Sequence, residues 1–143
     1  MSVHTALPAP DRPARWRRPP VRTAIATAWV LARLSPRRVR AVLRLARRGA
    51  RPATYGEAHL ARTEVMSLSV ACAGEGCLQR SLATALLCRM RGSWPTWCTG
   101  VRTQPFAAHA WVEAEGIPVG EETALAQYRP IMTVPPTADT GAE

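Results

Sequence analysis

The hydrophobic pattern of this 143-residue chain changes its period near Gly92, and this change limits the folds open to the chain. Before Gly92, apolar residues recur every three to four positions, as in amphipathic helices. After Gly92, short runs of apolar and β-branched residues are separated by turn residues, as in strands. Helices that precede a block of strands predict an α+β fold rather than a series of βαβ units.

Four helices are predicted, over residues 21–34, 36–48, 54–70 and 77–91. Ser35-Pro36 is a cap followed by a first-turn proline, and Gly49 and Gly92 end two of the helices. The apolar stripes predict four inward faces. They consist of Val21, Ile25, Ala28, Trp29 and Ala32; Val39, Val42, Leu43 and Ala46; Ala58, Ala61, Val65 and Leu68; and Leu78, Leu82, Ala85, Leu86 and Met90.

The strands are predicted over residues 97–102, 107–114, 117–119 and 127–134, with a hairpin turn at Glu115-Gly116. We expect a small antiparallel sheet, with the fourth helix packed on it.

The expected organisation is a single domain over residues 21–134. It comprises basic helices at 21–48 and a core at 52–134. A disordered tail rich in Pro and Arg precedes it at 1–20, and a loose tail follows at 135–143.

The positive charge is concentrated at the start of the chain. Residues 1–50 hold 12 arginines and one acid, whereas residues 51–143 hold 7 arginines and 9 acids. The basic character therefore belongs to the N-terminal helices and not to the predicted core. The apolar run at 23–32 is too short to span a membrane, so we expect no membrane span and a cytoplasmic protein.

The four cysteines are spaced 5, 11 and 10 residues apart, without a C-x-x-C pair. This spacing does not favour a zinc site, so we expect reduced thiols, no metal and no cofactor.

Cys77 and His109 are the residues most suggestive of chemistry. Cys77 follows the glycine-rich turn Gly74-Glu75-Gly76 and opens a predicted helix, where free N–H groups and the helix dipole favour a thiolate. His109 lies on a predicted strand and can accept and return the thiol proton. The pair therefore indicates a cysteine hydrolase or acyltransferase.

The other cysteines and histidines are interpreted as non-catalytic. Cys88 and Cys98 fit buried apolar positions, and Cys72 precedes the turn. His4 falls in the predicted tail and His59 on a predicted helix.

A third catalytic member is expected to orient the imidazole. Glu121 follows the strand after the histidine strand, and Glu122 is the neighbouring alternative. Glu113 is only four residues from His109 and Glu115 lies in the turn, so both are weaker candidates.

Three further residues are candidates for binding substrate or the oxyanion. Gln79 and Arg80 lie on the first turn of the helix that Cys77 opens. Arg80 could pair with Glu75 or a substrate carboxylate, although a structural role competes with both. Trp111 could wall a substrate groove, although core packing competes with it.

The motifs resemble those of one enzyme family, the lasso peptide biosynthesis B2 proteins. The resemblance covers about residues 52–134. It lies in Gly76-Cys77-Leu78-Gln79-Arg80-Ser81-Leu82-Ala83, Arg91-Gly92, Gly100-Val101-Arg102, Pro105-Phe106-Ala107-Ala108-His109-Ala110-Trp111-Val112-Glu113 and Gly116.

The resemblance implies a transglutaminase-like or papain-like core and a Cys-His-Asp triad. Cys77 matches the nucleophile, His109 the base and Glu121 the third position, where this chain departs from Asp. It also implies a peptidase that removes the leader of a lasso peptide precursor. The implied partners are that precursor, a separate leader-binding B1 protein and an ATP-dependent macrolactam cyclase, the C protein.

Two other classes of function compete with this interpretation. One is a nucleic-acid-binding protein, suggested by the early arginines but weakened by the lack of interleaved aromatic residues. The other is a non-catalytic scaffold in which Cys77 is vestigial. Of these three classes, we expect the chain to be the peptidase, and we expect it to have no nucleic-acid partner.

Overall fold

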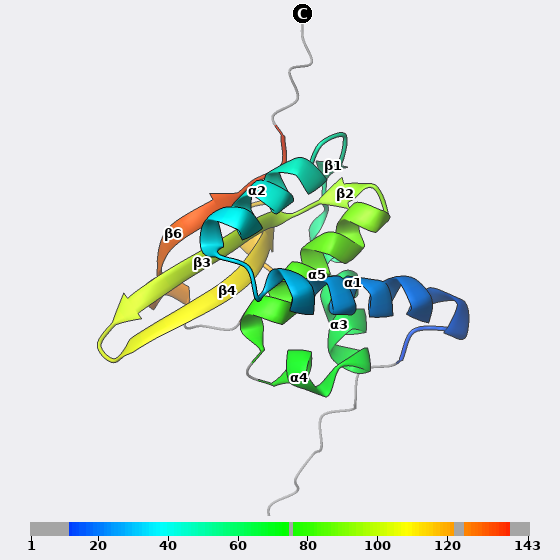
Figure 1. Ribbon diagram of the computed structural model, residues 1–143, viewed down its shortest axis with the longest axis horizontal. Helices are drawn as coiled ribbons and strands as arrows, with labels where there is room; N and C mark the ends of the chain where they lie inside the picture. Colours follow the sequence, from blue (N-terminus) through cyan, green and yellow to red (C-terminus); the bar gives the residue numbers. More distant parts are fainter. Residues whose placement is uncertain (1–11, 75, 122–124, 138–143) are drawn as a thin grey trace, which may run out of the picture.

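Helix α5 (Cys77–Met90) is at the centre of the molecule and packs against other helices and against an antiparallel sheet (Figure 1). The computed structural model describes residues 12–74, 76–121 and 125–137. Helices and strands occur in the predicted order, which confirms the α+β class.

Three helices precede α5 and agree broadly with the predicted ranges. They are α1 (Arg18–Leu31), α2 (Pro36–Ala46) and α3 (Tyr55–Leu68). A short helix, α4 (Val70–Ala73), follows α3 because Ser69 leaves the helical conformation. The Ser69 side chain accepts a hydrogen bond from the Cys72 backbone N–H, and so caps α4. The helix predicted over residues 54–70 is therefore two helices.

The main sheet has the strand order β5-β4-β3-β6, with all neighbours antiparallel. Its strands are β3 (Thr96–Thr103), β4 (Phe106–Ala114), β5 (Ile117–Pro118) and β6 (Arg129–Val134), preceded by the 3-10 turn η2 (Leu125–Gln127). Glu115 and Gly116 form the predicted hairpin turn, both with positive φ. The β3–β4 hairpin projects beyond the helices (Figure 1).

A second, two-stranded sheet was not predicted. Strand β1 (Arg51–Pro52) pairs in parallel with β2 (Ser93–Trp94). Each strand has only two residues, so neither produces a detectable periodicity. The Trp94 indole N–H donates to the Val134 carbonyl at 3.1 Å, which ties this small sheet to the end of β6.

The predicted inward face of α5 is partly wrong. Met90 is 51% exposed, whereas Leu87, outside the predicted stripe, is fully buried. Because α1, α3 and the sheet all pack on α5, even Ser81 and Thr84 are buried. The Trp97 indole N–H donates to Ser81 Oγ at 3.1 Å and thereby joins α5 to β3.

Trp29 was also expected to face the core, but it is 41% exposed. In α1 the fully buried positions are instead Val21, Ala24 and Ala28, with Leu31 nearly so. Small residues face α5 here, which allows the two helices to lie close together, and the bulkier indole lies outside this contact.

Helical structure is present before residue 21, where the first helix was predicted to start. A 3-10 turn, η1 (Arg15–Arg17), leads into α1 at Arg18. The carboxylate of Glu64, buried on α3, pairs with Arg17 at 2.8 Å and with Arg91 at 2.6 Å. The turn η1 is therefore linked through Glu64 to α3 and to the end of α5. The earlier part of the predicted tail and residues 138–143 lie outside the described residues.

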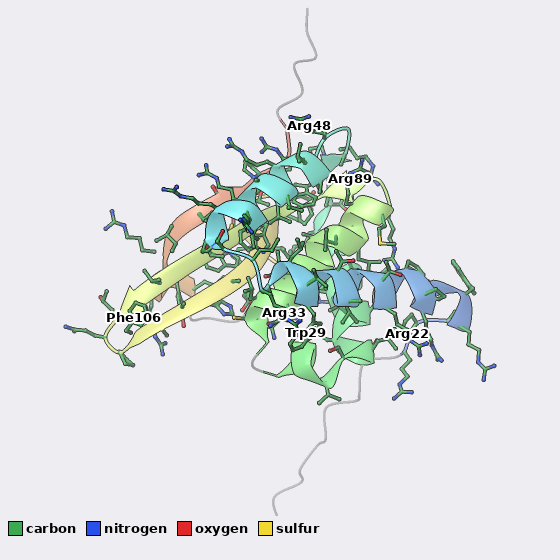
Figure 2. The ribbon with its side chains drawn as sticks, viewed as in Figure 1. Arg22, Trp29, Arg33, Arg48, Arg89 and Phe106 are labelled. Atoms are coloured by element: carbon green, nitrogen blue, oxygen red, sulfur yellow. The ribbon has the colours of Figure 1, made fainter. Side chains whose placement is uncertain are left out.

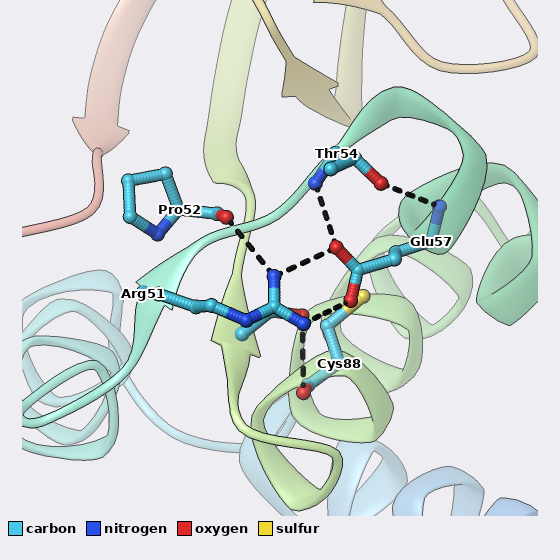
Figure 3. Close-up of polar contacts among 6 residues, drawn as sticks. Arg51, Pro52, Thr54, Glu57 and Cys88 are labelled. Atoms are coloured by element: carbon cyan, nitrogen blue, oxygen red, sulfur yellow. Dashed lines mark hydrogen bonds and ion pairs between the residues drawn. The ribbon is translucent and has the colours of Figure 1, made fainter.

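The N-terminus of α3 is closed by a capping box (Figure 3). Thr54 Oγ1 accepts from the Glu57 backbone N–H at 3.2 Å, and Glu57 accepts from the Thr54 backbone N–H at 3.1 Å. Arg51 pairs with the same carboxylate, which lowers the pKa of Glu57 to about 2. At α2, by contrast, Ser35 occupies the cap position without a side-chain cap bond, and Pro36 opens the helix.

Within the described ranges, no helix combines the length and apolar character needed to cross a bilayer. The described residues also hold no cluster of three or more His, Cys, Asp or Glu side chains arranged to bind a metal ion.

Candidate active site

Cys77 is the first residue of α5, with Gly76 at the cap position. The turn before it is held by Arg80, whose buried guanidinium donates to the carbonyls of Cys72 at 3.0 Å and Gly74 at 3.2 Å. The first-turn amides of a helix have no intrahelical acceptor. Cys77 therefore lies beside free N–H groups at the positive end of a 14-residue helix.

His109 lies in the middle of β4 and contacts both Cys77 and Glu121. Its Nε2 is 3.1 Å from Glu121 Oε2. His109 also shares a side-chain hydrogen bond with Cys77. Cysteine, imidazole and carboxylate thus form a continuous chain across α5, β4 and the segment after β5.

The titration of the pair reflects these contacts. The hydrogen bond with Cys77, and next that with Glu121, raise the pKa of His109 to about 9 against the effect of burial. The hydrogen bond with His109 lowers the pKa of Cys77, and the Ala110 backbone and the Arg80 charge contribute in the same direction. Both shifts favour a thiolate–imidazolium pair at neutral pH.

Two aromatic rings flank the imidazole. The Trp111 ring is stacked on His109 at 5.9 Å and 15°, and Tyr128 is tilted against it at 5.5 Å and 47°. The Trp111 indole N–H donates to Glu113 Oε1 at 3.0 Å. The Arg102 guanidinium lies 5.5 Å from the Tyr128 ring centroid. The rings restrict rotation of the imidazole and limit the access of water to it.

Gly100 is the partner of His109 in the β3–β4 register. A Cβ at this position would lie 2.8 Å from the Arg129 carbonyl oxygen and 3.0 Å from the Trp111 ring. Both distances are shorter than normal contacts, and the first involves a backbone atom. Glycine is therefore required here for β6 and Trp111 to approach β3.

A cavity of about 280 Å³ opens beside Cys77 and His109. Most of its lining is apolar and comes from the α1–α2 connection, α2, α5 and three strands. The lining residues are Leu34, Pro36, Val39, Cys77, Leu78, Trp97, Thr99, Gly100, Val101, Ala108, His109, Ala110, Ile131 and Met132. A peptide side chain of modest size fits such a volume next to the thiol.

The three predicted substrate or oxyanion residues have different positions. Arg80 is directed at its own turn and does not line the cavity, which corresponds to the structural alternative. The competing partner of Arg80, Glu75, lies outside the described residues. Trp111 is 3% exposed and is not in the cavity wall, where Trp97 is found instead. Gln79 is half-buried on the first turn of α5, also outside the cavity lining.

The weaker acidic candidates have other partners. Glu113 accepts the Trp111 indole N–H, and Glu115 accepts the backbone N–H of Tyr55 at the start of α3 at 2.9 Å. Glu122 lies outside the described residues. Of the candidates that the structure describes, Glu121 is the one in contact with His109.

The remaining cysteines differ chemically from Cys77. Burial raises the pKa of Cys88 and of Cys98 to about 12. Cys72 is fully buried. His59 is exposed on α3 and stacks on Tyr55 at 5.8 Å. His4 lies outside the described residues.

Several site residues were not found from the sequence. Tyr128, just before β6, and Arg62, on α3, reach the site only through tertiary packing. No local motif marks these two residues. The apolar residues Leu34 and Val39 were expected only as helix residues, and their position at the cavity follows from the packing of α2 against the sheet.

The geometry can support nucleophilic attack by sulfur, with proton transfer by His109. Comparison with known proteins agrees with this chemistry. A family model described as "Transglutaminase-like superfamily" matches residues 21–133. No curated protein and no solved structure matches the chain.

Proposed function

The chain belongs to the transglutaminase-like superfamily, and from this premise we propose that it is a cysteine peptidase that removes the leader from a lasso peptide precursor. This superfamily generally contains cysteine-type protease and transferase activities. The observation that carries the proposal is the Cys77–His109–Glu121 chain at the mouth of an apolar cavity. The B2-like motifs around Cys77 and His109 supply the choice of substrate.

The proposed reaction begins with attack of the Cys77 thiolate on the last carbonyl of the leader. A C–S bond forms, and the peptide C–N bond breaks as His109 gives its proton to the departing amine of the core peptide. His109 then takes a proton from water, whose oxygen attacks the thioester. The C–S bond breaks, the leader leaves as an acid and the thiol is restored.

The oxyanion is proposed to accept hydrogen bonds at the start of α5. The Cys77 backbone N–H is the first donor, because a first-turn amide has no acceptor within the helix. Gln79 is the proposed second donor, from the same turn. Glu121 keeps the ring in one orientation and stabilises the imidazolium that forms.

The difference among the cysteines supports catalysis over a scaffold role. The pKa of Cys77 is lowered, whereas the pKa of Cys88 and that of Cys98 are raised to about 12. A vestigial cysteine needs neither a hydrogen-bonded imidazole nor a carboxylate behind that imidazole.

The proposed partners are a leader-binding B1 protein and a macrolactam cyclase that consumes the freed amine. Helix α2 offers them a basic surface (Figure 2). Arg37, Arg38, Arg40 and Arg44 on α2 are all exposed, and no described carboxylate lies within 4.0 Å of them. Because α2 also lines the cavity, an acidic partner or leader bound there stays close to Cys77.

The test is mass spectrometry of a precursor incubated with the chain and a leader-binding partner. We expect wild type to release the leader, and Cys77→Ala and His109→Ala to release none while keeping the wild-type melting temperature. Cys72→Ala is the matched control and should cleave normally. Cleavage by Cys77→Ala, or its loss in Cys72→Ala alone, would contradict the proposal.

A further inference from the structure

Arg62, on the side of α3 that faces the site, has no role in the mechanism above. Its half-buried guanidinium lies directly against the backbone of Gly120. A Cβ on Gly120 would be 2.5 Å from Arg62 Nη1 and 2.8 Å from Cζ. Gly120 also has φ +65°, a conformation that L side chains rarely adopt. A side chain at position 120 would push the guanidinium away from the backbone and would strain the positive φ.

The residue after Gly120 is Glu121, so this contact lies one residue from the carboxylate on His109. The residue before it, Val119, is fully buried, and its N–H donates to the Val112 carbonyl of β4 at 2.9 Å. The segment that carries Glu121 thus hydrogen-bonds to β4 and lies against the Arg62 guanidinium.

Three basic side chains act on the Glu121 carboxylate. Glu121 faces His109, Arg62 and Arg80, while Arg62 also faces the phenol of Tyr55. Burial lowers the pKa of Arg62, the charge of Arg80 adds to this, and Glu121 opposes it. Burial raises the pKa of Glu121, but His109, Arg62 and Arg80 outweigh it, so the pKa lies below its ordinary value. Glu121 is the carboxylate that compensates these cations.

We propose that Arg62 is a positioning residue that holds the 119–121 segment so that Glu121 stays on His109 Nε2. The proposal rests on the role given to Glu121 above. Gly120 is the second residue of this contact, because without a side chain it lets the Arg62 guanidinium lie against the backbone.

If Arg62 is removed, a positioning role and a purely electrostatic role predict opposite changes in the pKa of His109. If Arg62 acted only as a nearby cation, its removal would relieve repulsion and raise the pKa of the imidazolium. If Arg62 holds Glu121 in place, its removal lets the carboxylate leave Nε2, and the pKa of His109 falls. The sign of the change therefore separates the two roles.

The experiment is an NMR titration of the histidine ring protons, for which the chain has only three histidines. It needs no substrate, so failure of leader cleavage and failure of this proposal give different results. For Arg62→Met we expect the pKa of His109 to fall by about one unit. Arg22→Met, an exposed arginine on α1, is the matched control and should leave it unchanged. An unchanged or raised pKa in folded Arg62→Met would overturn the proposal.

Gly120→Ala perturbs the same contact from the other side. We expect Gly120→Ala to lower the pKa of His109, as Arg62→Met does. The double variant Arg62→Met/Gly120→Ala should lower this pKa little further than either single variant. If Arg62→Met does not fold, a wild-type pKa in Gly120→Ala would itself overturn the proposal. Fully additive shifts in the double variant would also overturn it.

Discussion

Replacing Glu121 by Gln should separate the charge of the third site residue from its shape. Gln has the same size, and its amide oxygen can still accept from Nε2–H, so the substitution removes mainly the negative charge. The pKa of His109 is raised from 6.5 to about 9, with Cys77 as the first cause and Glu121 as the second. An opposite charge this close typically shifts a pKa by about 1–3 units, and each unit is a tenfold change in the stabilisation of the imidazolium.

Turnover by Glu121→Gln should therefore fall at least about tenfold, and by less than the roughly 10⁴-fold seen for the acid of a serine-protease triad. The loss is smaller because a thiolate–imidazolium pair depends less on the third member. KM should change little, since Glu121 does not line the cavity.

The assay is timed cleavage of the precursor at saturating concentration, with the leader-binding partner present. Glu113→Gln is the matched control: it removes the same charge, but from the Trp111 indole, so its turnover should stay close to wild type. Equal turnover by Glu121→Gln and wild type would refute the reasoning. Equal turnover together with a crippled Glu122→Gln would show that the neighbouring glutamate is the third member.

Three further predictions concern reactivity, stability and association. Iodoacetate should alkylate Cys77 before Cys88 or Cys98. The rate of Cys77 alkylation should fall as the pH rises through about 9, because His109 then loses the positive charge that attracts the anionic reagent. Equal labelling of the three thiols would contradict this prediction. Glu64→Gln should lower the free energy of unfolding in urea by about 2–4 kcal/mol, since two arginines lose a buried partner. Glu57, which is only partly buried in its ion pair with Arg51, is the control, and Glu57→Gln should lower the free energy of unfolding by less. Replacing Arg37, Arg38, Arg40 and Arg44 by Gln should weaken binding to an acidic leader-binding partner in titration calorimetry, whereas Arg22→Gln should not; unchanged affinity would exclude α2 from the interface.

The long helices and strands were predictable from the sequence. The four main helices and the strands β3 and β4 each span enough residues for the periodicity to appear. The two-residue strands β1 and β2 are too short for this, and their pairing joins segments about 40 positions apart. The inward face of α5 was misjudged because a helix packed on several sides has no single apolar stripe.

The candidate site divides in the same way. The turn before Cys77, the helix start and the strand of His109 are local features, so the sequence alone indicated a nucleophile and a base. Glu121 was selected by its place after the next strand, and the contact at Nε2 depends on how the segment returns to β4. From the sequence, a structural role for Arg80 competed with pairing to Glu75 or to a substrate carboxylate, and the carbonyl partners of Arg80 are seen only in the structure.

By itself, the sequence determined the fold class and indicated Cys77 and His109 as the candidate nucleophile and base, because helix periodicity, turn chemistry and strand patterning act over short distances along the chain. Only the tertiary structure decided what surrounds them: the apolar cavity, the rings of Trp111 and Tyr128, and Arg62 against Gly120. These contacts join elements far apart in the sequence. They depend on the packing of α2, α3 and β6 around α5, and no local pattern encodes that packing.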